Sequence, residues 1–227
     1  MVVAAQLSGD TVLSKEIRDK LDSHQDNQDK FRLPNRLTAK RFIFKLLYGA
    51  TDYGFYTDPD FFEVGYSQKE WADVIEKFYI KYYGIKKWHD VIIDEAKAKG
   101  RLEIPSGRYF PYAPTYQRGE FKWPITTIKN YPIQGFGADL VKLARLEAKK
   151  NLKASGLEAL LVSTIHDSIV VDAPAKNLDS IARILLDAVE SVPTLCKQVW
   201  DYDSQLPLTA DVQYGPNKRD MQDFKFT

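Results

Sequence analysis

Four residues at strict intervals of four, Arg36, Lys40, Phe44 and Tyr48, lie in the stretch RLTAKRFIFKLLYG. On an α-helix each step of four turns by about 40°, so these side chains form one stripe, with cations at one end and rings at the other. Cations suit a triphosphate, and aromatic rings suit a base and sugar that stack on them. The simpler interpretation is a basic amphipathic helix with aromatic residues at the edge of the core.

A histidine and an aspartate are adjacent in the stretch STIHDSIVVD, where β-branched residues flank a short turn. We expect a β-hairpin with His166 and Asp167 exposed at its tip. A carboxylate there could hold a metal ion, although a magnesium site on phosphates generally needs two carboxylates. Aspartate is also a common turn residue for backbone reasons, so an ordinary hairpin is the alternative.

The elements that must position these residues follow from periodicity and turn signals. Helical patterns are expected at residues 1–18, 35–48 (ending at Gly49), the stretch after a capping box at Ser67 and Glu70, 133–155, and a last amphipathic helix at 177–192. The remaining segments are expected to be a charged surface stretch at 19–30, a turn-rich connection at 51–66, loop with short strands at 100–125, and a closing strand at 208–215. Helices dominate and the strands look antiparallel, which indicates an α+β fold.

Composition limits the class of protein. The chain has 227 residues and a net charge of +1, so contact with nucleic acid must come from a local basic patch. Residues 30–45 contain six basic residues and no acidic one. The single cysteine, Cys196, excludes an internal disulfide and suits a reducing cytoplasm. The sequence shows no signal peptide and no apolar run of membrane-spanning length, so we expect a cytoplasmic protein without a membrane partner.

The order of the motifs resembles family A DNA polymerases, the group of bacterial polymerase I and many phage replicative enzymes. RLTAKRFIFKLLYG resembles that family's nucleotide-binding helix, NYPIQGFGADLVKLA resembles its segment with Asn, Pro and Gln-Gly before a helix, and IHDSIVVD resembles its third catalytic motif. AAQLSGD and the following DSH match the stretch after the first catalytic motif, and VQYGPNKRDM is similar to the closing strand and tail.

The resemblance implies roles toward an incoming dNTP. Arg36, Lys40 and His24 would hold its triphosphate, and Lys40 would also act as an acid toward the leaving pyrophosphate. Phe44 would pack beside the sugar and base. Tyr48 would lie where the template base is presented.

The resemblance also implies contacts with primer–template DNA and a metal. Gly49 would lie beside the template, and Asn130 and Gln134 would contact the minor-groove side of the duplex, where correct pairs offer similar acceptors. His166 would touch the primer end. Asp167 would bind catalytic Mg²⁺ in a site with two ions, with attack of the primer 3′-hydroxyl on the α-phosphate.

Three positions depart from the family's pattern. Ser168 stands where the family usually has a glutamate, Thr126 where an arginine is common, and Lys45 where a glycine is common. Aligned on AAQLSGD, the first catalytic motif would end just before Met1, so the second carboxylate ligand is expected outside this chain. We therefore expect a split polymerase of phage origin, inactive without a second polypeptide that carries that motif, the thumb and possibly an exonuclease. In a phage, the site of action would be the bacterial host cytoplasm.

The resemblance assigns residues 1–130 to the fingers, with an entry helix from the palm at 1–30, and residues 131–227 to the second half of the palm with the catalytic hairpin. Two alternatives have different functions. One is a non-catalytic module that binds primer–template or nucleotide, left by a degenerate polymerase. The other is a single-subunit RNA polymerase, although Gln134-Gly135 and the spacing at Phe44 favour a DNA polymerase.

Overall fold

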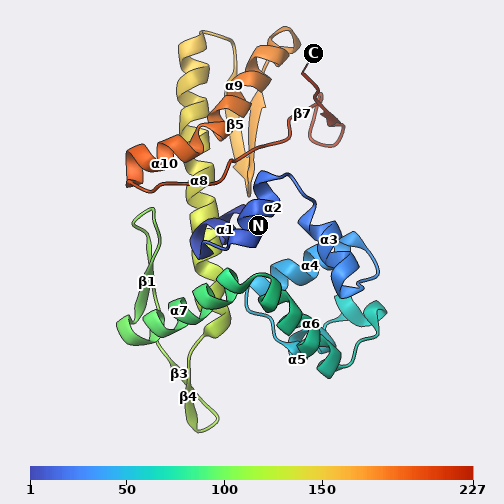
Figure 1. The fold of residues 1–227 in the computed structure, drawn as a ribbon. Helices are drawn as coiled ribbons and strands as arrows, with labels where there is room; N and C mark the ends of the chain where they lie inside the picture. The colour runs from blue at the N-terminus through green and yellow to red at the C-terminus, as the bar shows by residue number, and fades with distance from the viewer. Residues whose placement is uncertain (227) are drawn as a thin grey trace. The chain divides into compact units, whose positions relative to one another are not determined.

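The computed structural model describes residues 1–226, and its internal contacts divide the chain into two compact units, Met1–Gly135 and Phe136 onward (Figure 1). The long helix α8, Ile125–Ser155, contributes its first part to one unit and the rest to the other. Helices dominate, and the strands of the described residues form four two-stranded antiparallel sheets. The expected α+β class is confirmed. Within the described residues, no helix is long and apolar enough to cross a membrane.

The first unit is built mainly from helices and two short hairpins. Its helices are α1 Val2–Ser8, α2 Thr11–Arg18, α3 Ser23–Phe31, α4 Arg36–Leu47, α5 Asp52–Thr57, the 3₁₀ helix η1 Pro59–Val64, α6 Gln68–Lys81 and α7 Tyr83–Lys99. Its strands are β1 Arg101–Glu103, β2 Tyr109–Pro111, β3 Thr115–Gln117 and β4 Glu120–Lys122. The expected short strands at 100–125 are confirmed, as is the capping box, in which Ser67 and Glu70 bond each other's backbone N–H.

The core of the first unit forms around the inner face of α4. The residues expected on that face, Ala39, Phe42, Ile43 and Leu46, are all buried. The Phe42 ring contacts the rings of Phe31, Phe55, Trp71 and Phe78, which come from α3, α5 and α6. Burial of such rings is the main favourable term in folding a unit of this size. On the other side of α4, Arg41 and Lys45 pair with Asp58 and Asp60 around η1.

Several sequence expectations for the first unit are wrong. Residues 1–30 form three helices rather than one entry helix, and the charged surface stretch at 19–30 contains helix α3, which was not expected. The turn-rich connection at 51–66 contains α5 and η1, and a helix that was not expected, α7, follows α6. The helix expected at 133–155 begins already at Ile125, with Pro132 in its interior. The helices in these segments were not predicted from local composition, because contacts with residues far along the chain stabilise them despite their charged and turn-favouring residues.

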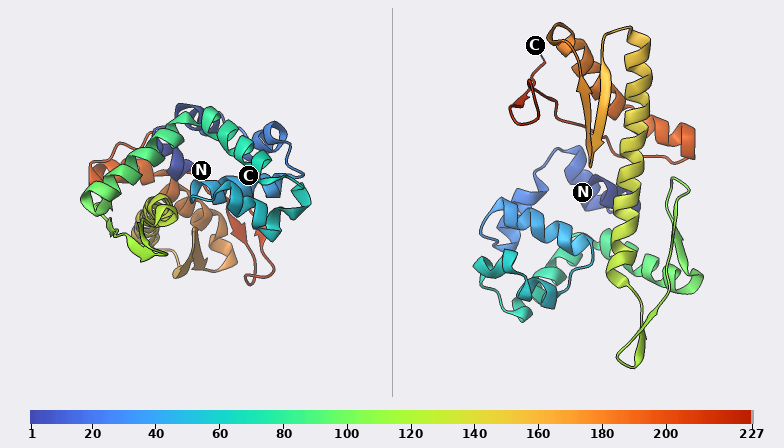
Figure 2. Two further views of the ribbon diagram at one scale, coloured as in Figure 1. Left: turned by 90° about the horizontal axis from the view of Figure 1, so that it is seen from below. Right: turned by 180° about the vertical axis from the view of Figure 1, so that it is seen from behind.

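The second unit contains the expected hairpin, formed by β5 and β6. Its elements are the later part of α8, β5 Leu160–Ile165, β6 Ser168–Asp172, the 3₁₀ helix η2 Ala175–Asn177, α9 Leu178–Glu190, α10 Val192–Trp200, β7 Gln213–Tyr214 and β8 Gln222–Asp223. Strands β5 and β6 lie beside the later part of α8 in Figure 1 and in the view from behind in Figure 2. Two expectations are corrected: α9 is not the last helix, since α10 follows it, and the closing strand at 208–215 is reduced to β7.

Candidate functional site

The four residues of the stripe lie along α4 beside its buried face. Asn35 starts the helix by accepting a hydrogen bond from the Thr38 N–H, at 2.8 Å. Arg36 and Lys40 are exposed, whereas Phe44 and Tyr48 are half-buried. The Lys40 ammonium lies 6.0 Å from the Phe44 ring, and the ring centroids of Phe44 and Tyr48 are 6.3 Å apart. Cationic and aromatic side chains therefore follow one another along the helix, as the spacing predicts.

His24 joins this stripe from helix α3. Its ring centroid lies 5.9 Å from that of Phe44, and its Nδ1 is buried with no hydrogen-bond partner among the described residues. Burial, followed by the positive charge of Arg36, lowers the pKa of His24 below its usual value. A polyanion bound between these groups would favour the protonated imidazole.

The other end of the stripe meets the start of α8. A side-chain hydrogen bond joins Tyr48 to Gln134, and burial raises the pKa of the tyrosine. Gly49 has φ +92°, and a Cβ at this position would lie 3.0 Å from the Cα of Thr126. Glycine therefore permits both the left-handed turn that ends α4 and the close approach of α8.

Asn130 lies one turn before Gln134 on the same helix. Its Oδ1 is buried and has no hydrogen-bond partner within the described part of the chain. At the adjacent Gly135, a Cβ would lie 2.5 Å from the Phe110 ring, so glycine allows β2 to pack against the backbone of α8. The amides of Asn130 and Gln134 are thereby fixed on one helix whose position relative to Tyr48 is determined by packing.

Two of the three departures from the family pattern have a structural explanation. Lys45 pairs with Asp58, lies 3.3 Å from Asp60, and covers the Phe61 ring at 5.2 Å, so it fastens α4 to η1. Ser168 donates a hydrogen bond to the Ile165 carbonyl across the hairpin turn, at 2.9 Å. For Thr126, the structure shows only the contact with Gly49.

The second unit presents His166 and Asp167 at the hairpin tip. Ile165 pairs with Ser168, so these two residues form the whole loop, and both are exposed. His166 has φ +52°, a left-handed conformation that costs energy for residues other than glycine. A strained histidine beside a carboxylate, at the end of a sheet, is an arrangement often found at functional sites.

The magnesium expectation can be tested against the carboxylates present. Within residues 1–226, no group of three or more His, Cys, Asp or Glu side chains gathers closely enough to hold a metal ion. Asp167 offers one carboxylate, and Ser168 beside it offers none. The described residues alone therefore do not fit a complete magnesium site.

Sequence reasoning missed the residues that support His24. Asp22 precedes α3 and accepts hydrogen bonds from the N–H groups of His24 and Gln25, both at 3.1 Å. Its other carboxylate oxygen lies 2.6 Å from Arg36 Nε. An aspartate at the start of a polar stretch is a helix-capping signal that the high charge of this segment concealed.

Comparison with known proteins identifies the family of this chain. A family model described as DNA polymerase family A matches residues 1–220. This chain belongs to DNA polymerase family A. The family's members similar to it include DNA polymerase I of Geobacillus stearothermophilus, 29% identical over 94% of this chain and 24% of that protein. DNA polymerase I of Aquifex aeolicus is 30% identical over 81% of this chain and 32% of that protein.

A solved structure of the family supports the fold. The polymerase domain of Pol1 from M. smegmatis, in complex with primer–template DNA and dNTP, matches 84% of this chain and 35% of that chain, with a TM-score of 0.73 at 18% identity. The chain spans about a quarter to a third of the length of the curated relatives named above. The activities of those whole proteins can therefore only be inferred for this chain.

Proposed function

We propose that this chain is the part of a DNA-directed DNA polymerase that binds the incoming dNTP along the Arg36–Tyr48 stripe of α4. The observation that carries the proposal is the continuous series of contacts from His24 and Lys40, through Phe44 and Tyr48, to Gln134. Cations at one end suit a triphosphate, rings in the middle suit a sugar and base, and amides at the far end suit base-pair edges.

In this proposal, the triphosphate binds Arg36, Lys40 and His24, and Phe44 packs beside the deoxyribose and base. The primer 3′-hydroxyl gives its proton to solvent and its oxygen forms a bond to the α-phosphorus. The bond from that phosphorus to the bridging oxygen breaks, and pyrophosphate leaves. Lys40 donates a proton or a hydrogen bond to the pyrophosphate as its charge develops. Positioning and charge stabilisation by these cations supply this chain's part of the catalysis.

Primer–template DNA would meet both units. Tyr48 and Gly49 would lie beside the template base, and Asn130 and Gln134 would offer their amides to the minor groove. At the hairpin, His166 would contact the primer end.

Asp167 would supply one carboxylate to the two-magnesium chemistry of the family. Since the described residues alone do not form a metal site, other ligands would come from substrate phosphates and from residues outside this chain. We propose that a separate polypeptide carries the missing carboxylate, so that the 227 residues alone bind nucleotide without extending primers.

The test measures nucleotide binding and primer extension separately. Binding of dTTP to the chain should weaken about tenfold in Lys40→Ala, while Lys15→Ala, an exposed lysine on α2, should leave it unchanged. Extension of a labelled primer should appear only when a polypeptide carrying the family's first catalytic motif is added, and Asp167→Ala should reduce it by about 10²-fold or more.

Each result has a distinct meaning. Extension by the chain alone would overturn the proposed dependence on a second polypeptide. Nucleotide or DNA binding without extension under any complementation would favour the non-catalytic binding module. Equal dTTP binding by the wild type and Lys40→Ala would contradict the α4 site itself.

A further inference from the structure

We propose that Asp22 is a positioning residue: it caps the backbone of helix α3 at His24 and orients the guanidinium of Arg36, so that both residues contact the same phosphate chain. This inference rests on the proposed function, because it assigns the support of that nucleotide site. It adds a residue to which the family resemblance gave no role.

The two oxygens of the Asp22 carboxylate have different partners. Oδ1 accepts the backbone N–H groups of His24 and Gln25, each at 3.1 Å, and so caps helix α3. Oδ2 accepts the Nε–H of Arg36 at 2.6 Å. One short side chain therefore connects the first turn of α3 with the first turn of α4.

The engaged atom of Arg36 is its Nε. Bonding through Nε fixes the plane of the guanidinium and leaves both terminal nitrogens for a second acceptor. Those nitrogens form the fork that binds phosphate oxygens in pairs. Asp22 thus orients the arginine without occupying the part that a phosphate would bind.

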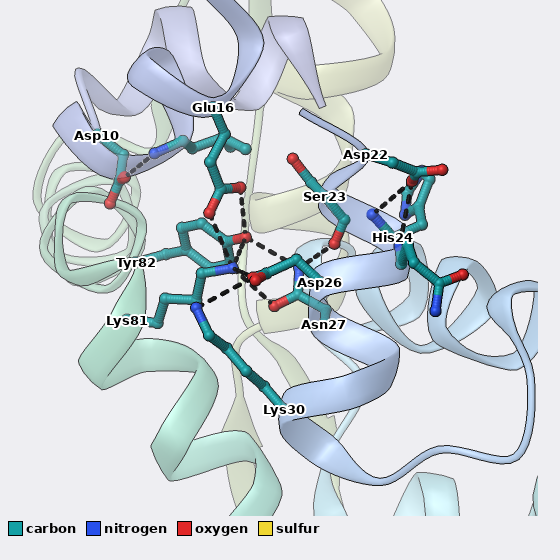
Figure 3. Close-up of polar contacts among 12 residues, drawn as sticks. Asp10, Glu16, Asp22, Ser23, His24, Asp26, Asn27, Lys30, Lys81 and Tyr82 are labelled. Atoms are coloured by element: carbon teal, nitrogen blue, oxygen red, sulfur yellow. Dashed lines mark hydrogen bonds and ion pairs between the residues drawn. The ribbon is translucent and has the colours of Figure 1, made fainter. Parts of the chain in front are cut away.

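Helix α3 is a rigid reference for this contact because a buried polar network anchors it (Figure 3). Asn27 donates to the Tyr82 hydroxyl at 2.9 Å, and Lys81 donates to Asp26 at 2.6 Å. Lys81 also lies 2.9 Å from Glu16 on α2, with only 12% of its side chain exposed. These contacts restrain the start of α3, so the bond from Asp22 also restrains the position of Arg36.

Stability alone does not explain an aspartate here. The side chains of Asp22 and Arg36 are 46% and 52% exposed, and ion pairs that face water contribute little to folding. Serine, threonine or asparagine would cap α3 equally well. The carboxylate also repels a triphosphate, which disfavours an aspartate at this position unless it has another role. Orientation of Arg36 through its Nε is a role that a neutral cap residue does not provide.

The experiment compares Asp22→Asn, which keeps an acceptor for the cap but presents a donor to Arg36, with Asp19→Asn, an exposed aspartate paired with Lys15 on α2. Binding of dTTP and of inorganic tripolyphosphate to the full chain is measured by calorimetry. Asp22→Asn should raise both dissociation constants about tenfold with an unchanged melting temperature, and Asp19→Asn should change neither.

Two further readouts separate orientation from general charge effects. In an Arg36→Ala background, Asp22→Asn should have no additional effect on tripolyphosphate binding, because the group it orients is absent. The Arg36 Nε–H resonance should be protected from solvent exchange in the wild type and lose protection in Asp22→Asn.

Other outcomes overturn the inference in recognisable ways. Tighter or unchanged anion binding in Asp22→Asn, with weaker binding in Arg36→Ala, would show that Asp22 competes with phosphate or has no part in binding. If Arg36→Ala itself leaves binding unchanged, the proposed nucleotide site fails at that residue and the positioning role falls with it.

Discussion

The backbone of His166 has a strained conformation. Its φ of +52° places it in the left-handed region, which glycine adopts freely and histidine does not. Such strain is retained where a side chain must stand at a particular place, here the exposed tip of the β5–β6 hairpin.

We expect His166→Gly to raise the free energy of unfolding by roughly 1 kcal/mol, because it relieves this backbone strain. The same change should lower primer extension by the complemented protein. Urea denaturation and primer extension measure the two effects, and Ser163→Gly, in the middle of β5, should instead destabilise the chain. A less stable His166→Gly protein would contradict the strain.

His89 gives a pH dependence that the sequence does not reveal. It is 1% exposed, and its Nδ1 lies 3.1 Å from the Tyr79 hydroxyl. Burial, helped by the charge of Lys129, lowers the pKa of His89 from 6.5 to about 3. His89 is therefore protonated near pH 6.5 in the unfolded chain, but only near pH 3 in the folded chain.

The contribution of neutral His89 to the free energy of unfolding is therefore complete above pH 6.5. It is lost as the pH falls from 6.5 toward 3. Between pH 6.5 and 4.5, the wild type should lose about 2–3 kcal/mol more than His89→Gln, which cannot be protonated. Urea denaturation at the two pH values measures the difference. Parallel losses in the two proteins would mean that His89 titrates normally in the folded state.

At the scale of elements, helices α2, α3 and α6 are joined by the ionic network around Lys81 (Figure 3). The Tyr82 hydroxyl donates to Glu16 at 2.8 Å and accepts from Lys81 and Asn27 at 2.6 and 2.9 Å, so its hydrogen-bonding capacity is filled. A filled network of this kind fixes the relative placement of helices.

Removal of one partner should be costly. We expect Lys81→Met to destabilise the chain by about 3–5 kcal/mol, because it leaves the Glu16 carboxylate buried without its cation. The double variant Glu16→Gln, Lys81→Met should recover part of that loss. Lys86→Met, which breaks an exposed pair with Asp90, should change stability by less than about 0.5 kcal/mol. Additive losses in denaturation experiments would exclude coupling between Glu16 and Lys81.

The elements differ in how far the sequence predicts them. The inner face of α4 and the β5–β6 hairpin were predictable because their patterns depend on near neighbours. Helix α3 was not, since its Asp26 pairs with Lys81, which lies more than fifty positions away along the chain. The support given by Asp22 was also hidden, because the contact with Arg36 joins two helices across a turn.

At the scale of the whole molecule, the two units carry different parts of the proposed chemistry. The first unit holds the residues assigned to the nucleotide, and the second holds the His166–Asp167 tip. With a net charge of +1, the chain has no general attraction for DNA, so affinity must come from local features such as the basic residues at 30–45. Binding to DNA should therefore be strongest where these local features meet phosphates.

The distribution of carboxylates sets an expectation for magnesium. No metal-binding cluster of three or more side chains is present in residues 1–226, and a single carboxylate such as Asp167 binds Mg²⁺ poorly. Calorimetric titration of Mg²⁺ into the chain alone should give a dissociation constant above about 1 mM, equal in wild type and Asp167→Ala. With dTTP present, Mg²⁺ binding should tighten because phosphate oxygens supply ligands, and Lys40→Ala should reduce that gain. A sub-millimolar site in the free chain that Asp167→Ala abolishes would mean that further ligands gather around Asp167.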